Sequence, residues 1–122
     1  MSNETAAFFD ALGRRGHEPL LATVTGRAQF DVVDSSRTDR WLVAISKGDI
    51  TVSHKRGTAD CTIRGSEALF DDLASGRTNA TAAVLRGALL VSGDLELFFA
   101  IQRIFPGPPR KAPSNRDVRS SQ

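Results

Sequence analysis

Polar and apolar residues alternate with a period of two from Thr23 to Val33, which is the pattern of a half-buried β-strand. Two shorter apolar runs follow, Trp41 to Ser46 and Ile50 to His54, and the tight turn Lys47-Gly48-Asp49 between them predicts a hairpin. A fourth strand is expected around Cys61, which alternates with polar neighbours on both sides. The first half of the chain therefore predicts four strands.

Helical periodicity surrounds these strands. The segment after Thr5 places Ala6, Phe9 and Leu12, with Phe8 beside them, on one face of a short helix that Gly13 or Gly16 can end. Further along the chain, Ser66 is a suitable N-cap for a helix whose apolar side holds Leu69, Phe70 and Leu73 and which ends at Gly76. A third short helix is expected from about Ala80 to Arg86, with Gly87 after it.

The end of the folded region is the most apolar part of the chain. Residues 88–92 predict a fifth strand, buried on both faces by its composition, and Asp94 can cap the helix that follows. From Leu95 to Phe105 that helix has only three polar residues, so its apolar face is wider than one stripe. Ordinary core, a dimer interface and a lipid-sized cavity are the three ways to cover such a face.

The order of these elements indicates the fold class. A helix, four strands, two helices, a strand and a helix form an α+β arrangement in which one sheet carries helices on one side. The chain of 122 residues suits a single domain, which we place at residues 1–106. Residues 107–122 are rich in proline and basic residues, and we expect them to form a flexible tail.

The charge distribution argues against a nucleic-acid partner. The formal net charge is +2, but the segment from Pro106 onward carries +3 and the rest of the chain −1. A basic footprint on the folded domain is therefore not expected, although the tail could touch acidic lipid headgroups. The single Cys61, the lack of a secretory signal and the lack of a long apolar span favour a cytoplasmic protein.

Reactive groups are few and scattered. His17 and His54 have no second ligand at a metal-binding spacing, and Cys61 falls on the apolar side of its strand. Glu67 and Asp71 share one helix face at i and i+4, where a solvated surface is expected because the apolar side lies elsewhere. We therefore expect no catalytic residues, no metal site, no cofactor and no enzyme activity.

The order of residues from Ala59 to Phe105 resembles the sterol carrier protein 2 (SCP-2) domain. The resemblance extends from about Phe8 to Phe105 and is looser in the first strands. It rests on the ordered series Asp60, Thr62, Ile63, Ser66, Leu69, Leu73, Gly76, Gly87, Leu90, Gly93, Asp94, Leu95 and Leu97, preceded by Gly26, Phe30, Trp41, Val43, Ile45, Gly48 and Ile50.

This resemblance implies a five-stranded mixed sheet with helices packed on one face, enclosing an apolar tunnel for a fatty acid, a fatty acyl-CoA or a sterol. It implies noncatalytic carriage of such ligands and brings no catalytic residues. Apolar position and resemblance together predict a set of lining residues. They are Phe8, Phe9, Leu12, Val84, Leu85, Phe98, Ile101, Ile104 and Phe105.

Two other functions stay open from the sequence. The same fold with a filled core would be a protein-interaction or dimerisation module, and an accessory domain would present a hydrophobic substrate to an enzyme. Expected partners are thus a hydrophobic small molecule or lipid, with transient membrane contact and a homodimer as further alternatives.

Overall fold

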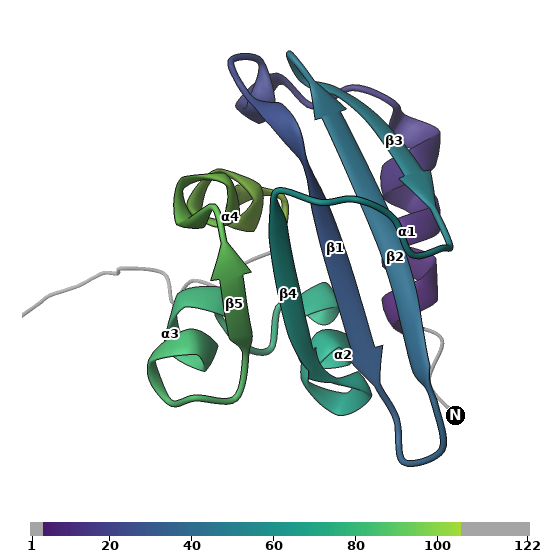
Figure 1. Ribbon diagram of the computed structural model, residues 1–122, viewed down its shortest axis with the longest axis vertical. Coiled ribbons are helices and arrows are strands. Elements are labelled where there is room, and N and C mark those ends of the chain that lie inside the picture. Colours follow the sequence, from purple (N-terminus) through teal and green to yellow (C-terminus); the bar gives the residue numbers. More distant parts are fainter. Residues whose placement is uncertain (1–3, 106–122) are drawn as a thin grey trace, which may run out of the picture.

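The computed structural model of the protein describes residues 4–105, and the predicted tail at residues 107–122 lies outside them. One five-stranded sheet organises the fold, as Figure 1 shows. The elements along the chain are α1 (Glu4–Arg15), η1 (Pro19–Leu21), β1 (Thr25–Val33), β2 (Thr38–Ser46), β3 (Asp49–Ser53), β4 (Cys61–Ser66), α2 (Glu67–Ser75), α3 (Ala80–Leu85), β5 (Leu90–Gly93), α4 (Leu95–Ile101) and η2 (Gln102–Ile104).

The sheet is mixed, with strand order β3-β2-β1-β4-β5. β1 pairs with β2 in antiparallel and with β4 in parallel register, so Phe30 lies opposite Trp41 on one side and Ile63 on the other. The hairpin of β2 and β3 and the antiparallel pair of β4 and β5 complete it. The predicted α+β class, with a five-stranded mixed sheet, is confirmed.

Helices α1, α2 and α4 pack on the face of the sheet that carries the apolar residues of β1. Phe9 of α1 stacks on Trp41, Phe70 of α2 contacts Phe30, and Leu97 of α4 lies over Gly26. We call this the helix face. The opposite face, here the open face, carries the polar alternate positions of β1, which is why the sequence of this strand shows a period of two.

The chain crosses the open face once, between β3 and β4. These strands lie on opposite sides of β1 and β2, so residues 54–60 must pass over the sheet (Figure 1). Leu42 of β2 faces this segment and is nonetheless buried, because Gly57 approaches its side chain closely. In the part of the chain that the structure describes, this segment covers only part of the open face.

Local capping signals in the sequence are confirmed. The Ser66 side chain accepts a hydrogen bond from the Leu69 N–H, and the Asp94 side chain accepts one from the Leu97 N–H. Gly76 ends α2 with a φ of +82°, a conformation that residues with a Cβ rarely adopt. Each signal acts within a few residues, so the sequence alone is enough to place it.

The burial predicted for β5 is wrong. β5 was expected to be buried on both faces, but it is an edge strand, and Leu90 is 59% exposed. Leu90 lies opposite Arg64 on the open face, on which none of the described helices packs, whereas Val91 lies opposite Ile63 on the helix face. Composition alone does not distinguish an edge strand with one uncovered face from a central one.

Candidate functional site

An aromatic cluster fills the space between α1, the helix face of the sheet and the C-terminal end of the described chain. Its centre is Phe30 of β1, whose ring centroid lies 5.1 Å from that of Phe9 and 6.1 Å from that of Phe105. Phe8 stacks on Phe105, with centroids 4.7 Å apart and planes at 9°. The full aromatic cluster is Phe8, Phe9, Phe30, Trp41, Phe70 and Phe105.

The structure brings most of the predicted lining residues to this interior. Phe9 is buried, while Phe8, Phe105 and Val84 are partly buried and pack against the core. The remaining buried members of the predicted set, all within one hydrophobic core, are Leu12, Phe98, Ile101 and Ile104. Leu85 is 82% exposed at the end of α3, so the fold does not bring it to the others.

Within residues 4–105, the protein's own core covers one side of the final helix. Leu97, Phe98 and Ile101 are buried, whereas Leu95 and Phe99 are about half exposed, at 52% and 50%. The wide apolar face of this helix is therefore only partly used for packing.

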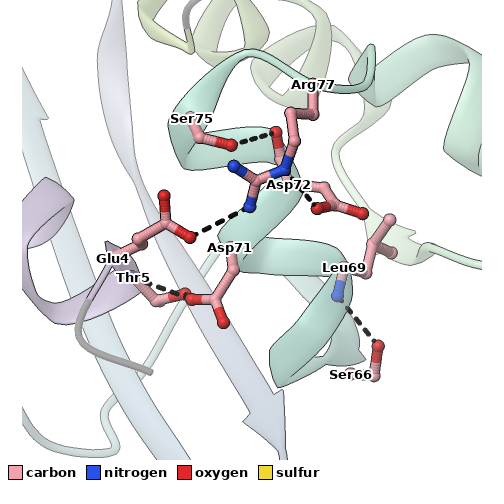
Figure 2. Close-up of polar contacts among 8 residues, drawn as sticks. All are labelled: Glu4, Thr5, Ser66, Leu69, Asp71, Asp72, Ser75 and Arg77. Atoms are coloured by element: carbon pink, nitrogen blue, oxygen red, sulfur yellow. Dashed lines mark hydrogen bonds and ion pairs between the residues drawn. The ribbon is translucent and has the colours of Figure 1, made fainter. Parts of the chain in front are cut away.

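Helix α1 is held in place by a buried carboxylate, although the sequence pattern predicts a solvated surface for this residue. Asp71 is only 6% exposed, and its Oδ1 accepts hydrogen bonds from the Thr5 N–H (3.1 Å) and the Thr5 hydroxyl (2.6 Å) (Figure 2). The expectation of a solvated face was wrong for this residue because α1 packs against α2 at that point. Asp71 therefore acts as an N-terminal cap for a helix that lies 66 residues away in the sequence.

An arginine adds a second link beside this cap. The Arg77 guanidinium donates one hydrogen bond to Glu4 of α1 and one to Asp72 of α2, both 2.9 Å long (Figure 2). These two carboxylates raise the pKa of Arg77 above its usual value, with the hydrogen bond to Glu4 as the largest cause. The first turn of α1, and with it the position of Phe8 and Phe9, is thus fixed by polar contacts to α2.

Two clefts border the aromatic cluster. The larger, of about 590 Å³, lies between α1 and the β2–β3 edge of the sheet and includes Phe9 and Trp41 in its lining. The smaller, of about 240 Å³, lies between α3 and η2 and includes Phe105. The volume of the larger cleft falls within the roughly 300–1,000 Å³ typical of small-molecule sites.

The titratable groups near this interior do not form a reactive constellation. The pKa of the Cys61 thiol is raised from 9.0 to about 11, mainly by burial and also by the nearby charges of Asp94 and Asp60. His54 stacks on Trp41 with ring centroids 4.1 Å apart, and more than half of its side chain is exposed. Among residues 4–105, no group of three potential metal ligands is found.

Three members of the aromatic cluster were not predicted as site residues: Phe30, Trp41 and Phe70. Phe30 and Trp41 were assigned to strands and Phe70 to the buried side of its helix. The alternation along β1 does place Phe30 on the apolar face, but only the strand register shows that Trp41 lies directly opposite it. The packing of α1 then adds Phe9 to the same group.

The fold and the apolar interior agree with one protein family. Residues 9–106 match the family model described as the SCP-2 sterol transfer family, so the chain belongs to this family. The resemblance noted from the sequence is thereby confirmed. A comparison with curated protein sequences gives no match.

Solved structures support the same fold. The sterol carrier protein domain 2 of Helicoverpa armigera has 22% sequence identity and a TM-score of 0.68, over 82% of this chain and 86% of that one. Sterol carrier protein 2 of Aedes aegypti, in complex with palmitate, has 17% identity and a TM-score of 0.67, over 84% and 94% of the two chains. The ubiquinone synthesis protein UbiJ has 21% identity and a TM-score of 0.61, over 82% and 90%.

Proposed function

We propose that this protein binds and carries a hydrophobic ligand, a fatty acid, a fatty acyl-CoA or a sterol, without catalysing a reaction. The observation that carries the proposal is the aromatic cluster beneath α1, which two clefts border. Membership of the SCP-2 sterol transfer family supports it, as does the palmitate bound to the Aedes aegypti protein of the same fold.

The ligand would occupy the space between α1, the final helix and the sheet. Phe9, Phe98 and Ile101 are at most 2% exposed, so a ligand must displace side chains to enter. Phe8 and Phe105 are only partly buried and stack on each other at the edge of the cluster. We infer that separation of these two rings opens the interior.

The energy available to such a ligand comes mainly from its apolar chain. Each methylene removed from water contributes about 0.8 kcal/mol, so an acyl chain reaches micromolar affinity without specific polar contacts. Selectivity among chains of similar length is then expected to be weak, because each added methylene changes the affinity only a few-fold.

The test uses the full chain, native mass spectrometry after mild purification and titration with a fluorescent fatty acid. Phe105→Ala is expected to weaken the fatty acid about fivefold to tenfold, because it removes one ring of the stacked pair. Leu85→Ala is the control: this side chain is exposed and outside the interior, so affinity should not change.

The result that would contradict the proposal is a protein that carries no co-purified lipid and shows no saturable fatty-acid binding. If Phe105→Ala and Leu85→Ala change the fatty-acid affinity equally, the ligand binds outside the aromatic cluster, which also contradicts the proposal. Melting temperatures of both variants separate a lost contact from a lost fold.

An accessory role is a second candidate, and one comparison favours it. A solved sec-alkyl sulfatase, PisA1, contains the same fold within a longer chain: 84% of this chain aligns with 16% of that one, at 15% identity and a TM-score of 0.66. Here the domain would hold a hydrophobic substrate for an enzyme. The isolated protein should then bind a fatty acid without turnover of acyl esters or alkyl sulfates, a result that fits both carriage and this accessory role. Turnover of either substrate would contradict the noncatalytic proposal.

A further inference from the structure

A small hollow lies on the open face of the sheet, on the side opposite the aromatic cluster. Its volume is about 210 Å³, and we call it the arginine hollow. Its lining residues come from β1, β2, β4 and the segment that crosses the sheet, and they are Gln29, Asp31, Arg40, Arg56, Gly57 and Thr62. The hollow is too small for an acyl chain or a sterol and suits a compact polar group.

The crossing segment is fixed above the hollow by one buried amide. Gln29 is only 4% exposed, and its side-chain N–H groups donate to the carbonyl oxygens of Trp41 and Lys55, both at 3.3 Å. Its carbonyl oxygen accepts from the Gly57 N–H at 3.0 Å. Lys55 and Gly57 flank Arg56, so both backbone neighbours of this arginine are hydrogen-bonded, whereas its side chain is exposed.

A carboxylate orients two further arginines. Asp31 lies opposite Arg40 in β2 and Arg64 in β4, and each guanidinium approaches it with one nitrogen at 3.6 Å. Arg40 uses its Nε and Arg64 its Nη1, so further N–H donors of both remain for another partner. Among residues 4–105, Arg56 has no ion-pair partner, and Asp31 Oδ1 accepts no hydrogen bond.

The charge of this group is unbalanced. Arg40 and Arg64 approach the carboxylate of Asp31, and Arg56 lines the same hollow, so these four groups together carry an excess of two positive charges on the open face. Guanidinium groups match the geometry of phosphate oxygens better than a lysine does, and a carboxylate behind them pre-orients their donors. The Thr62 hydroxyl lines the same hollow and can add a hydrogen bond.

From this arrangement we propose that the arginine hollow binds a phosphate group, held by Arg40 and Arg56 and supported by Arg64. The phosphate belongs either to the headgroup of a membrane lipid or to a free phosphate ester. This site is separate from the apolar interior, because the sheet lies between them. Its occupancy therefore does not depend on the proposed lipid carriage.

The experiment compares soluble and membrane-bound phosphate with the full chain. Inorganic phosphate and glycerol 3-phosphate are titrated by NMR, with the amide signals of Arg56, Gly57 and Thr62 as reporters. In parallel, sedimentation measures binding to phosphatidylcholine vesicles with and without phosphatidylglycerol. Saturable shifts with the soluble probes identify a free phosphate ester, and binding only to phosphatidylglycerol vesicles identifies a lipid headgroup; either result supports the proposal.

Arg56→Ala is the decisive variant, because the residue is exposed and its loss should not affect folding. We expect phosphate or vesicle binding to weaken about tenfold, with partial recovery in Arg56→Lys. Lys55→Ala is the matched control: it removes the same charge from the same segment but does not line the hollow. Fatty-acid binding should stay unchanged in both variants.

Two results would overturn the proposal. One is the absence of saturable binding to any of these probes. The other is equal weakening by Lys55→Ala and Arg56→Ala, which would indicate a diffuse attraction by charge and not a site.

Discussion

Replacing Asp71 with alanine tests how the interior is held together. The side chain accepts two hydrogen bonds from Thr5, at 3.1 and 2.6 Å, and it is 6% exposed. Loss of a helix N-cap costs about 0.5–2 kcal/mol. An additional part of the cost arises because the Thr5 hydroxyl and N–H lose their acceptor in a buried place, where an unsatisfied group costs about 1–3 kcal/mol. We expect Asp71→Ala to reduce the free energy of unfolding by about 2–3 kcal/mol.

The neighbouring Asp72 supplies the matched control. Its side chain is 45% exposed, and its ion pair with Arg77 lies at the surface, where such pairs contribute about 0–1 kcal/mol. Asp72→Ala should therefore cost less than about 1 kcal/mol. Asp71→Asn retains an oxygen acceptor and should recover part of the stability that Asp71→Ala loses.

Urea denaturation of the full chain measures these differences, and hydrogen exchange locates them. In Asp71→Ala the amides of α1 should exchange faster, whereas those of β1 should follow the global stability. If the free energies of unfolding of Asp71→Ala and Asp72→Ala differ by less than about 0.5 kcal/mol, the buried cap does not hold α1 and the reasoning is refuted. Faster fatty-acid uptake in Asp71→Ala would connect the same contact to access to the interior.

Three further predictions concern the thiol, a turn and the final helix. The Cys61 thiol has a pKa of about 11 in the folded state and 9.0 in the unfolded state, so the folded protein should contain about 100-fold less thiolate at pH 8 than the unfolded chain. The contribution of the protonated thiol to stability should be lost as the pH rises from 9 to 11. A thiolate absorbance titration with a midpoint near pH 9 in the folded protein would contradict this prediction. Gly87→Ala should lower the free energy of unfolding by about 1–2 kcal/mol, because of the positive φ of this residue alone. Gly93→Ala should lower it more, because the added Cβ would also clash with the Asp60 carbonyl oxygen, and equal urea midpoints for the two variants would disprove the clash. Phe98 is buried and Phe99 is half exposed, so Phe98→Ala should lower the free energy of unfolding by about 3–5 kcal/mol and Phe99→Ala by less than about 1 kcal/mol. Urea denaturation measures both values, and the reverse order would show that the buried face of the final helix is misassigned.

Much of the fold was predictable because its signals are local. The alternation in β1 follows from a sheet with one covered face, and the hairpin of β2 and β3 follows from its short turn. Strand ends were less accurate: β1 begins at Thr25 instead of Thr23, and β2 begins at Thr38 instead of Trp41. The hydrogen bonds that end a strand depend on the partner strand, and the sequence does not show that partner.

The candidate site was predictable in composition but not in arrangement. Apolar position and the family resemblance together selected Phe8, Phe9 and Phe105, which the structure brings together, and also Leu85, which it leaves exposed. A hydrophobic residue at the end of a short helix faces inward only if another element packs there. Within residues 4–105, no helix is long and apolar enough to cross a membrane.

The sequence alone was enough to predict the five strands and the four α-helices, the caps at Ser66 and Asp94, and the excess of apolar residues in the final helix, but not the two short 3-10 helices η1 and η2. These features depend on groups within a few residues of each other, so the local chain contains the whole cause. The edge position of β5, the burial of Asp71 and the position of Gly57 above β1 follow from tertiary contacts, which the sequence does not show. Each of these depends on contacts between distant parts of the chain, and burial and charge balance arise only once those parts meet.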